Sequence, residues 1–193
     1  MPGRPALFLD RDGVVVVERN YLAKPEDVAL EAGAAELMRW AHEKGLALVC
    51  PTNQSGMARG RISHEALEAV EAEIARQLAE QGAAFDLVIA CPFHPDFTPG
   101  YGAEQARWRK PGPAMLELAG KMMEIDLKAS WLVGDKTADI EAARAAGLAG
   151  AVHVLTGHGK AHREEALALA NEGFAVLPAD DLPETLTLLR ERF

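Results

Sequence analysis

Short apolar runs alternate with longer amphipathic segments along the whole chain. Six runs have the length of a β-strand: Ala6–Leu9, Leu46–Cys50, Leu87–Cys91, Trp131–Val133, Ala151–Leu155 and Phe174–Leu177. The segments between and after them have helical periodicity: Ala34–Lys44, Ser63–Gln81, Pro113–Ile125, Thr137–Ala146, Ala161–Asn171 and Pro183–Arg192. Because strands that alternate with helices form parallel sheets covered on both faces, the pattern predicts a single α/β domain over residues 1–193.

Two connections are longer than such a sheet requires. They are Gly13–Gly33, after the first strand, and Pro92–Gly112, after the third. Both leave the carboxyl end of a strand, and long ordered loops in a compact domain are usually functional. We therefore expect both to border a site at that edge of the sheet.

Two aspartates follow the first apolar run, in the order Asp10-Arg11-Asp12-Gly13. Ligands of open α/β sheets bind at the carboxyl edge of the strands. Residues two apart in an extended chain point the same way, so Asp10 and Asp12 are expected to face one site. Two close carboxylates repel unless a cation or a proton-transfer role stabilises them. This arrangement is typical of a metal-dependent phosphoryl-transfer site.

Polar groups follow other strands at the same predicted edge. Pro51–Gly56 carries hydroxyl, amide and backbone N–H groups that could cradle phosphate oxygens, although an ordinary polar turn has the same composition. Further along, Lys110 could neutralise a carboxylate and a phosphate, and Arg109 could bind a phosphate or a sugar hydroxyl. A basic stretch of this kind is also common on solvated faces.

A further aspartate ends the fourth strand. Asp135 would add a third carboxylate oxygen, the kind of ligand that Mg²⁺ prefers. Asp139 lies one helical turn beyond it and would either orient the metal's water shell or serve as an acid favoured by the helix dipole. The sequence is compatible with both roles of Asp139.

Composition and charge narrow the function classes. A hydrophobic fraction of 49% and a charged fraction of 25% are typical of a globular protein and argue against long disorder. The net charge of −9 disfavours nucleic-acid binding through a basic surface, so an anionic substrate would be attracted locally. Cys50 and Cys91 provide no disulfide framework. No run approaches the ~20 apolar residues of a membrane span or the core of a signal peptide. We expect a cytoplasmic location without membrane contact.

Taken together, these motifs resemble those of the haloacid dehalogenase (HAD) superfamily of phosphatases, in the branch of the D-glycero-D-manno-heptose 1,7-bisphosphate 7-phosphatases and histidinol phosphatases. The resemblance spans roughly residues 5–160. It implies a three-layer, Rossmann-like parallel sheet with helices on both faces and no large cap domain. It is carried by the stretches Phe8–Val14, Tyr21–Asp27, Thr52–Gly60, Arg109–Pro111 and Val133–Lys136.

The resemblance also implies a role for each motif residue. Asp10 would be the nucleophile that forms an aspartyl-phosphate, and Asp12 would act as acid and then base. Mg²⁺ would be bound by Asp10, the backbone carbonyl of Asp12, and Asp135. The predicted contacts with the substrate come from Thr52, Asn53 and Lys110 at the phosphate, from Gln54 and Ser55 beside them, and from Glu18, Arg19, Asn20, Tyr21, Arg109 and Lys136 elsewhere.

One segment departs from the family pattern. Many relatives bind a structural zinc through a Cys-x-His pair and a Cys-x-Cys pair that precede Arg-Lys-Pro. Here the pairs read Cys91-Pro92-Phe93 and Ala106-Arg107-Trp108, and His94 is one position late. One thiolate and one imidazole do not make a four-ligand site, so we expect no structural zinc. The aromatic residues expected to pack this loop are Phe93, Phe97, Tyr101 and Trp108.

The function expected from these residues is a Mg²⁺-dependent phosphatase of a small sugar-type phosphate monoester, with the heptose bisphosphate first. The alternatives are histidinol phosphate or another small phosphomonoester and, in another class, a non-catalytic sugar-phosphate-binding protein. The chain is expected to be a monomer or a small homo-oligomer. Further histidines and one loop remain unassigned. His42, His64, His153 and His162 are expected to be packed or solvated, and His94 is expected to border the site, with or without a direct role. The loop Gly157–Lys160 would either bind a distal phosphate or form an exposed turn.

Overall fold

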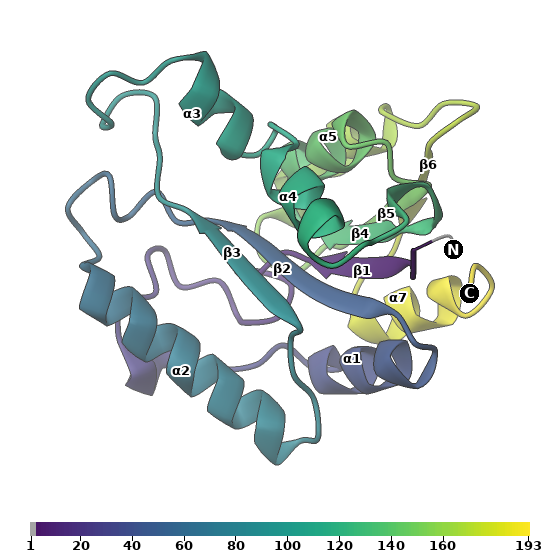
Figure 1. Cartoon of the computed structure of the whole chain (residues 1–193). Coiled ribbons are helices and arrows are strands. Elements are labelled where there is room, and N and C mark those ends of the chain that lie inside the picture. The colour runs from purple at the N-terminus through teal and green to yellow at the C-terminus, as the bar shows by residue number, and fades with distance from the viewer. Residues whose placement is uncertain (1–2) are drawn as a thin grey trace.

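A six-stranded, fully parallel sheet runs through the middle of the protein (Figure 1). The computed structural model describes residues 3–193. The strands are β1 (Ala6–Leu9), β2 (Ala47–Asn53), β3 (Leu87–Cys91), β4 (Trp131–Gly134), β5 (Gly150–His153) and β6 (Ala175–Pro178). Their order is β3-β2-β1-β4-β5-β6.

Helices cover both faces of the sheet (Figure 1). Helices α1, α2 and α7 lie on one face, and α4, α5 and α6 lie on the other. Their bounds are α1 (Ala34–Glu43), α2 (His64–Glu80), α3 (Ala103–Trp108), α4 (Ala114–Met122), α5 (Thr137–Ala145), α6 (Gly159–Leu167) and α7 (Leu182–Leu189), with 3-10 turns at Pro25–Asp27 and Leu127–Ala129. Within residues 3–193, no helix has the length and apolar character needed to cross a membrane.

The central position of β1 in the sheet explains why its sequence is continuously apolar. All four residues of β1 are buried, because successive side chains enter opposite apolar layers. Leu7 and Leu9 pack in the layer beneath α1, α2 and α7, whereas Ala6 and Phe8 pack in the layer beneath α4, α5 and α6. The sheet is therefore the middle of three layers, and the predicted Rossmann-like fold class is confirmed.

The predicted strands and helices are all present, and the differences lie in the ends of several elements and in one additional helix, α3. Strand β2 continues to Asn53, three residues beyond the prediction, because Thr52 and Asn53 still pair with β3. Helix α6 begins at Gly159 rather than at Ala161. Helix α3 was not predicted at all, because glycine and proline dominate the segment that precedes it and only six helix-forming residues follow.

The order of the strands places β1 beside both β2 and β4. The chain moves outward from β1 to β3 and then returns to the other side of β1. Ligands of doubly wound sheets bind where the strand order reverses, in the crevice beyond the carboxyl ends. In this protein Asp10 follows β1 and Asp135 follows β4, so both aspartates lie at that point.

Candidate active site

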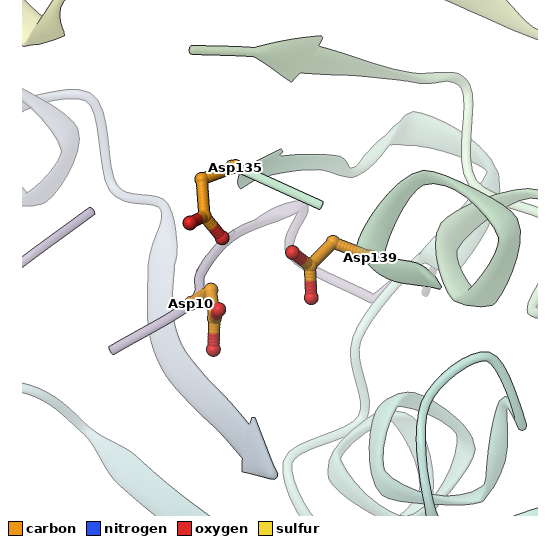
Figure 2. Close-up of side chains that lie close together, drawn as sticks. All are labelled: Asp10, Asp135 and Asp139. Carbon is orange, nitrogen blue, oxygen red and sulfur yellow. The ribbon is translucent and has the colours of Figure 1, made fainter. Parts of the chain in front are cut away.

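Three buried carboxylates meet at the carboxyl edge of the sheet (Figure 2). Asp10 follows β1, Asp135 follows β4, and Asp139 lies in the first turn of α5. One oxygen of each lies within 4.8 Å of one oxygen of the others. Asp139 therefore lies within the carboxylate cluster, and it also caps α5, because its side chain accepts the backbone N–H of Lys136 at 3.0 Å.

Lys110 is the main counter-charge of this cluster. Its ammonium nitrogen lies 2.7 Å from Asp10 Oδ1 and 2.6 Å from Asp139 Oδ1, and it also donates to the carbonyl of Pro51. Burial opposes the charge of Lys110, but the carboxylates of Asp10 and Asp139 outweigh that penalty and raise its pKa. Lys110 therefore remains a cation in a nearly inaccessible position.

One ammonium group does not balance three carboxylates. Burial, followed by the charges of Asp139 and Asp10, raises the pKa of Asp135 to about 8. Among residues 3–193, Asp135 Oδ1 is buried without a hydrogen-bond partner, and the nearest cationic nitrogen, Lys136 Nζ, is 3.8 Å away. A hard divalent cation bound by these oxygens would remove the repulsion and occupy the unpartnered atom, so the donor set fits Mg²⁺.

The second aspartate of the first motif has a different environment. Asp12 accepts hydrogen bonds from the Arg11 guanidinium at 2.9 and 3.0 Å and from Gln54 Nε2 at 2.8 Å. Arg11 is itself buried and also pairs with Glu71 of α2 at 2.7 Å. The carboxylate of Asp12 thus faces the pocket outside the three-carboxylate cluster, and only its backbone carbonyl remains a candidate metal ligand.

The predicted phosphate cradle at the end of β2 is held in place by hydrogen bonds. Both ends of the Asn53 amide bind the backbone of Lys110, at 3.0 and 3.1 Å, and fix the segment that carries the lysine. Gln54 Nε2 donates to Thr52 Oγ1 as well as to Asp12. Ser55 also reaches the pocket. Asn53 therefore positions Lys110, in addition to lining the pocket.

A cavity of about 290 Å³ opens above these groups. The residues that line it come from the strand ends and from four later or intervening segments: Asp10, Arg11, Asp12, Glu18, Asn20, Tyr21, Leu22, Thr52, Asn53, Gln54, Ser55, Gly56, Arg109, Lys110, Lys136, Ala138, Asp139 and His158. Of the predicted substrate-binding residues, Arg19 is not among them. It is exposed, because the chain turns away from the cavity between Glu18 and Asn20.

The wall of the pocket contributed by the first long loop has an unusual backbone. Asn20 and Tyr21 have φ angles of 41° and 73°, a region that non-glycine residues seldom adopt. The Glu18 carboxylate accepts the N–H of Asn20 at 2.8 Å, and the Arg61 guanidinium lies 4.6 Å from the centre of the Tyr21 ring. The carboxylate oxygen Oε2 of Glu18 also lies 3.4 Å from His158 Nε2. These contacts hold the wall in a fixed conformation.

The second long loop is held by a contact that the sequence did not reveal. An Arg59 nitrogen lies 2.7 Å from His94 Nε2, and the guanidinium stacks over Phe97 at 4.2 Å. Phe97 packs on His94 within the loop although its ring is partly exposed, and Phe93 and Trp108 pack against the core. The carbonyl of Phe93 accepts a hydrogen bond from Arg109.

Within residues 3–193, the three aspartates form the sole cluster of at least three side chains that could bind one metal ion.

Sequence reasoning missed or left unassigned three residues that line the site or belong to its carboxylate cluster, and one, His153, that contacts it from behind through the carbonyl of Asp135. Arg11 lies between two motif aspartates in the sequence, and the only signal that could have pointed to its ion pair with Glu71 is its positive charge. For Asp139 the sequence left two roles open, orientation of the metal's water shell or an acid at the helix N-terminus. The composition of the loop that contains His158 is typical of an exposed turn, and the apolar run that contains His153 is typical of a packed strand. No sequence signal distinguished the two histidines.

Comparisons with known proteins agree with this geometry. The HAD-hydrolase-like family model matches residues 107–185. A D-glycero-β-D-manno-heptose-1,7-bisphosphate 7-phosphatase of Mesorhizobium japonicum is 37% identical over 188 residues, which cover 97% of this chain and 82% of the relative. The chain belongs to the HAD superfamily of phosphatases. It is therefore a phosphoric monoester hydrolase.

Two further relatives extend this result. A protein of the same name from Yersinia pestis is 40% identical over 153 residues, covering 79% of this HAD phosphatase and 81% of the relative. The crystal structure of D,D-heptose 1,7-bisphosphate phosphatase from B. bronchiseptica, complexed with magnesium and phosphate, superposes with a TM-score of 0.84 at 29% identity. That superposition covers 98% of this chain and 99% of the other.

Proposed function

We propose that this HAD phosphatase removes the 7-phosphate of D-glycero-β-D-manno-heptose 1,7-bisphosphate through an aspartyl-phosphate on Asp10. The observation that carries the proposal is the arrangement at the switch point of the sheet. Asp10 is held by Lys110 within the carboxylate cluster, and Asp12 stands beside it on the pocket wall. The names of the relatives in Mesorhizobium and Yersinia support the choice of substrate and of anomer.

The two half-reactions divide between the two aspartates. A carboxylate oxygen of Asp10 attacks phosphorus, the bond from phosphorus to the C7 oxygen breaks, and Asp12 donates a proton to the departing alkoxide. A water molecule then attacks the aspartyl-phosphate, Asp12 accepts its proton, and the bond from phosphorus to Asp10 breaks to release inorganic phosphate. Since the transition state of phosphoryl transfer is loose, positioning and charge supply most of the acceleration.

Mg²⁺ is the cation that the site would hold, through Asp10, the backbone carbonyl of Asp12, and Asp135. When bound, it would neutralise charge on the carboxylates and on the transferred phosphoryl group. Asp139 accepts the backbone N–H of Lys136 at 3.0 Å and pairs with Lys110, so it would fix both lysines around the phosphate. The magnesium in the B. bronchiseptica structure supports this assignment.

Phosphate release tests the proposal. The substrates are both anomers of D-glycero-D-manno-heptose 1,7-bisphosphate, histidinol phosphate and fructose 1,6-bisphosphate, each with Mg²⁺ and with EDTA. We expect Mg²⁺-dependent turnover of the β anomer with kcat/KM above about 10⁴ M⁻¹s⁻¹, within the usual range for enzymes. A higher kcat/KM for histidinol phosphate than for either heptose anomer would show that the proposed substrate is wrong. Asp10→Asn should bind substrate without turnover, and turnover by that variant would exclude the aspartyl-phosphate.

A further inference from the structure

His153 is a buried imidazole that the proposed reaction does not use. It ends β5, opposite Gly134 in the neighbouring strand, and its side chain is inaccessible to solvent. The ring nitrogen Nε2 lies 3.0 Å from the backbone carbonyl oxygen of Asp135. A carbonyl can only accept a hydrogen bond, so Nε2 carries the proton. The other ring nitrogen, Nδ1, has no partner among the described residues.

The segment that follows His153 contacts the side-chain carboxylate of the same aspartate, Asp135. The backbone N–H of His158 donates to Asp135 Oδ2 at 2.8 Å. Thr156 Oγ1 donates to the carbonyl of Gly13 at 2.5 Å. We call residues 153–158 the strap, because its hydrogen bonds hold the carbonyl and carboxylate of Asp135 together with the chain beside Asp12.

The close approach of the strap depends on glycine. A Cβ atom on Gly157 would lie 2.4 Å from Asp135 Oδ2 and 2.7 Å from the Cα of Gly13. Gly157 also has a φ angle of 57°, which other residues adopt with strain. The backbone of the strap is thus packed directly on the metal-binding carboxylate.

We infer that His153 is a positioning residue for the metal site, acting through the hydrogen bond from Nε2 to the carbonyl of Asp135. This inference rests on the proposed function, which assigns Asp135 as a metal ligand. The bond fixes the backbone at the end of β4, and so the direction of the unpartnered Asp135 Oδ1. Outer partners of metal ligands typically contribute 10- to 100-fold in metal affinity. His153 would do so from a strand that contributes no ligand.

The test is titration of the metal-free full chain with MgCl₂ by isothermal calorimetry. His153→Leu keeps a side chain of similar volume but loses the N–H donor, and we expect its Mg²⁺ dissociation constant to rise about 10- to 100-fold. His153→Gln retains an N–H donor and should recover most of the affinity. Ser130→Ala is the matched control, because it removes a buried hydrogen bond to the N–H of Ala6 at the opposite edge of the sheet. It should bind Mg²⁺ as the unmodified protein does.

Each other outcome overturns the inference. If His153→Leu binds Mg²⁺ normally while its melting temperature falls, the ring is only structural. If His153→Gln is as weak as His153→Leu, the shape of the ring matters and the hydrogen bond does not. If the unmodified protein fails to bind Mg²⁺, or if Asp135→Asn binds it equally well, the proposed metal site fails first and the role of His153 with it.

Discussion

The ammonium nitrogen of Lys110 lies 2.7 Å from Oδ1 of Asp10, and both side chains are almost fully buried. Lys110→Met would leave the three buried carboxylates without this cation. Removing one partner of a buried ion pair typically costs 3–5 kcal/mol, so we expect a loss of about that size in the free energy of unfolding together with loss of turnover. Urea denaturation and phosphate release measure the two effects.

An exposed lysine provides the control for this prediction. Lys121→Met, on α4, removes the same charge at the surface and should change stability by less than about 0.5 kcal/mol. Equal stability of the Lys110 and Lys121 variants would show that the buried lysine does not neutralise the cluster.

Asp135→Asn should separate stability from function. The carboxylate of Asp135 is buried beside two others, and its pKa is raised to about 8 by that burial and by those charges. In the absence of divalent cations, the neutral amide should therefore raise the free energy of unfolding, by roughly 1–2 kcal/mol. With saturating Mg²⁺ the order should reverse, because only the unmodified protein gains stability from the bound ion. A metal-free variant less stable than the unmodified protein would contradict the repulsion.

The contact between Arg59 and His94 predicts an effect on substrate binding. Neither residue lines the pocket, but their contact holds the loop whose Phe93 carbonyl binds Arg109. We expect Arg59→Met to raise KM by about 3- to 10-fold with a much smaller change in kcat, the pattern of lost uniform binding. Arg76→Met on the exposed face of α2 is the control. A fall in kcat alone would place Arg59 in the chemistry instead.

The buried thiol of Cys50 predicts a loss of stability at alkaline pH. Burial, followed by the charges of Glu71 and Asp10, raises the pKa of Cys50 well above its ordinary value. Above pH ~8.5 an unfolded chain releases this proton while the folded chain keeps it, so the free energy of unfolding falls as pH rises. The slope for one such group is at most about 1.4 kcal/mol per pH unit. Cys50→Ala should have a flatter profile between pH 8 and 10 by urea denaturation, and parallel profiles would refute the shift.

Metal analysis addresses the departure from the zinc-binding relatives. Cys91 is buried, its pKa is raised chiefly by burial, and His94 is engaged with Arg59. We expect protein purified without chelators to contain far less than one zinc per chain. A stoichiometric zinc that resists dialysis would contradict this expectation.

Much of the site could be predicted because it depends on where strands end. Asp10 and Asp135 follow apolar runs, and parallel strands bring their carboxyl ends to one edge, so both aspartates were expected at that edge. That β1 and β4 are adjacent, which makes the two aspartates neighbours, is seen only in the structure. The partners of Arg11 and His153 could not be predicted in this way. Arg11 pairs with Glu71 on a helix, and His153 binds the backbone of Asp135, so each contact depends on packing that local sequence does not encode.

The site also sets the order in which this protein can become active. Asp10 and Lys110 are separated by 100 residues, and Thr156 and Gly13 by 143, so their contacts close very long loops. Contacts of such sequence separation form late, because the entropy of closing the loop is lost before the contact stabilises the chain. During synthesis Asp10 therefore cannot meet Lys110, nor Gly13 meet Thr156, until those later residues have been made. Recovery of phosphatase activity should accordingly be the last signal to return when the denatured chain refolds.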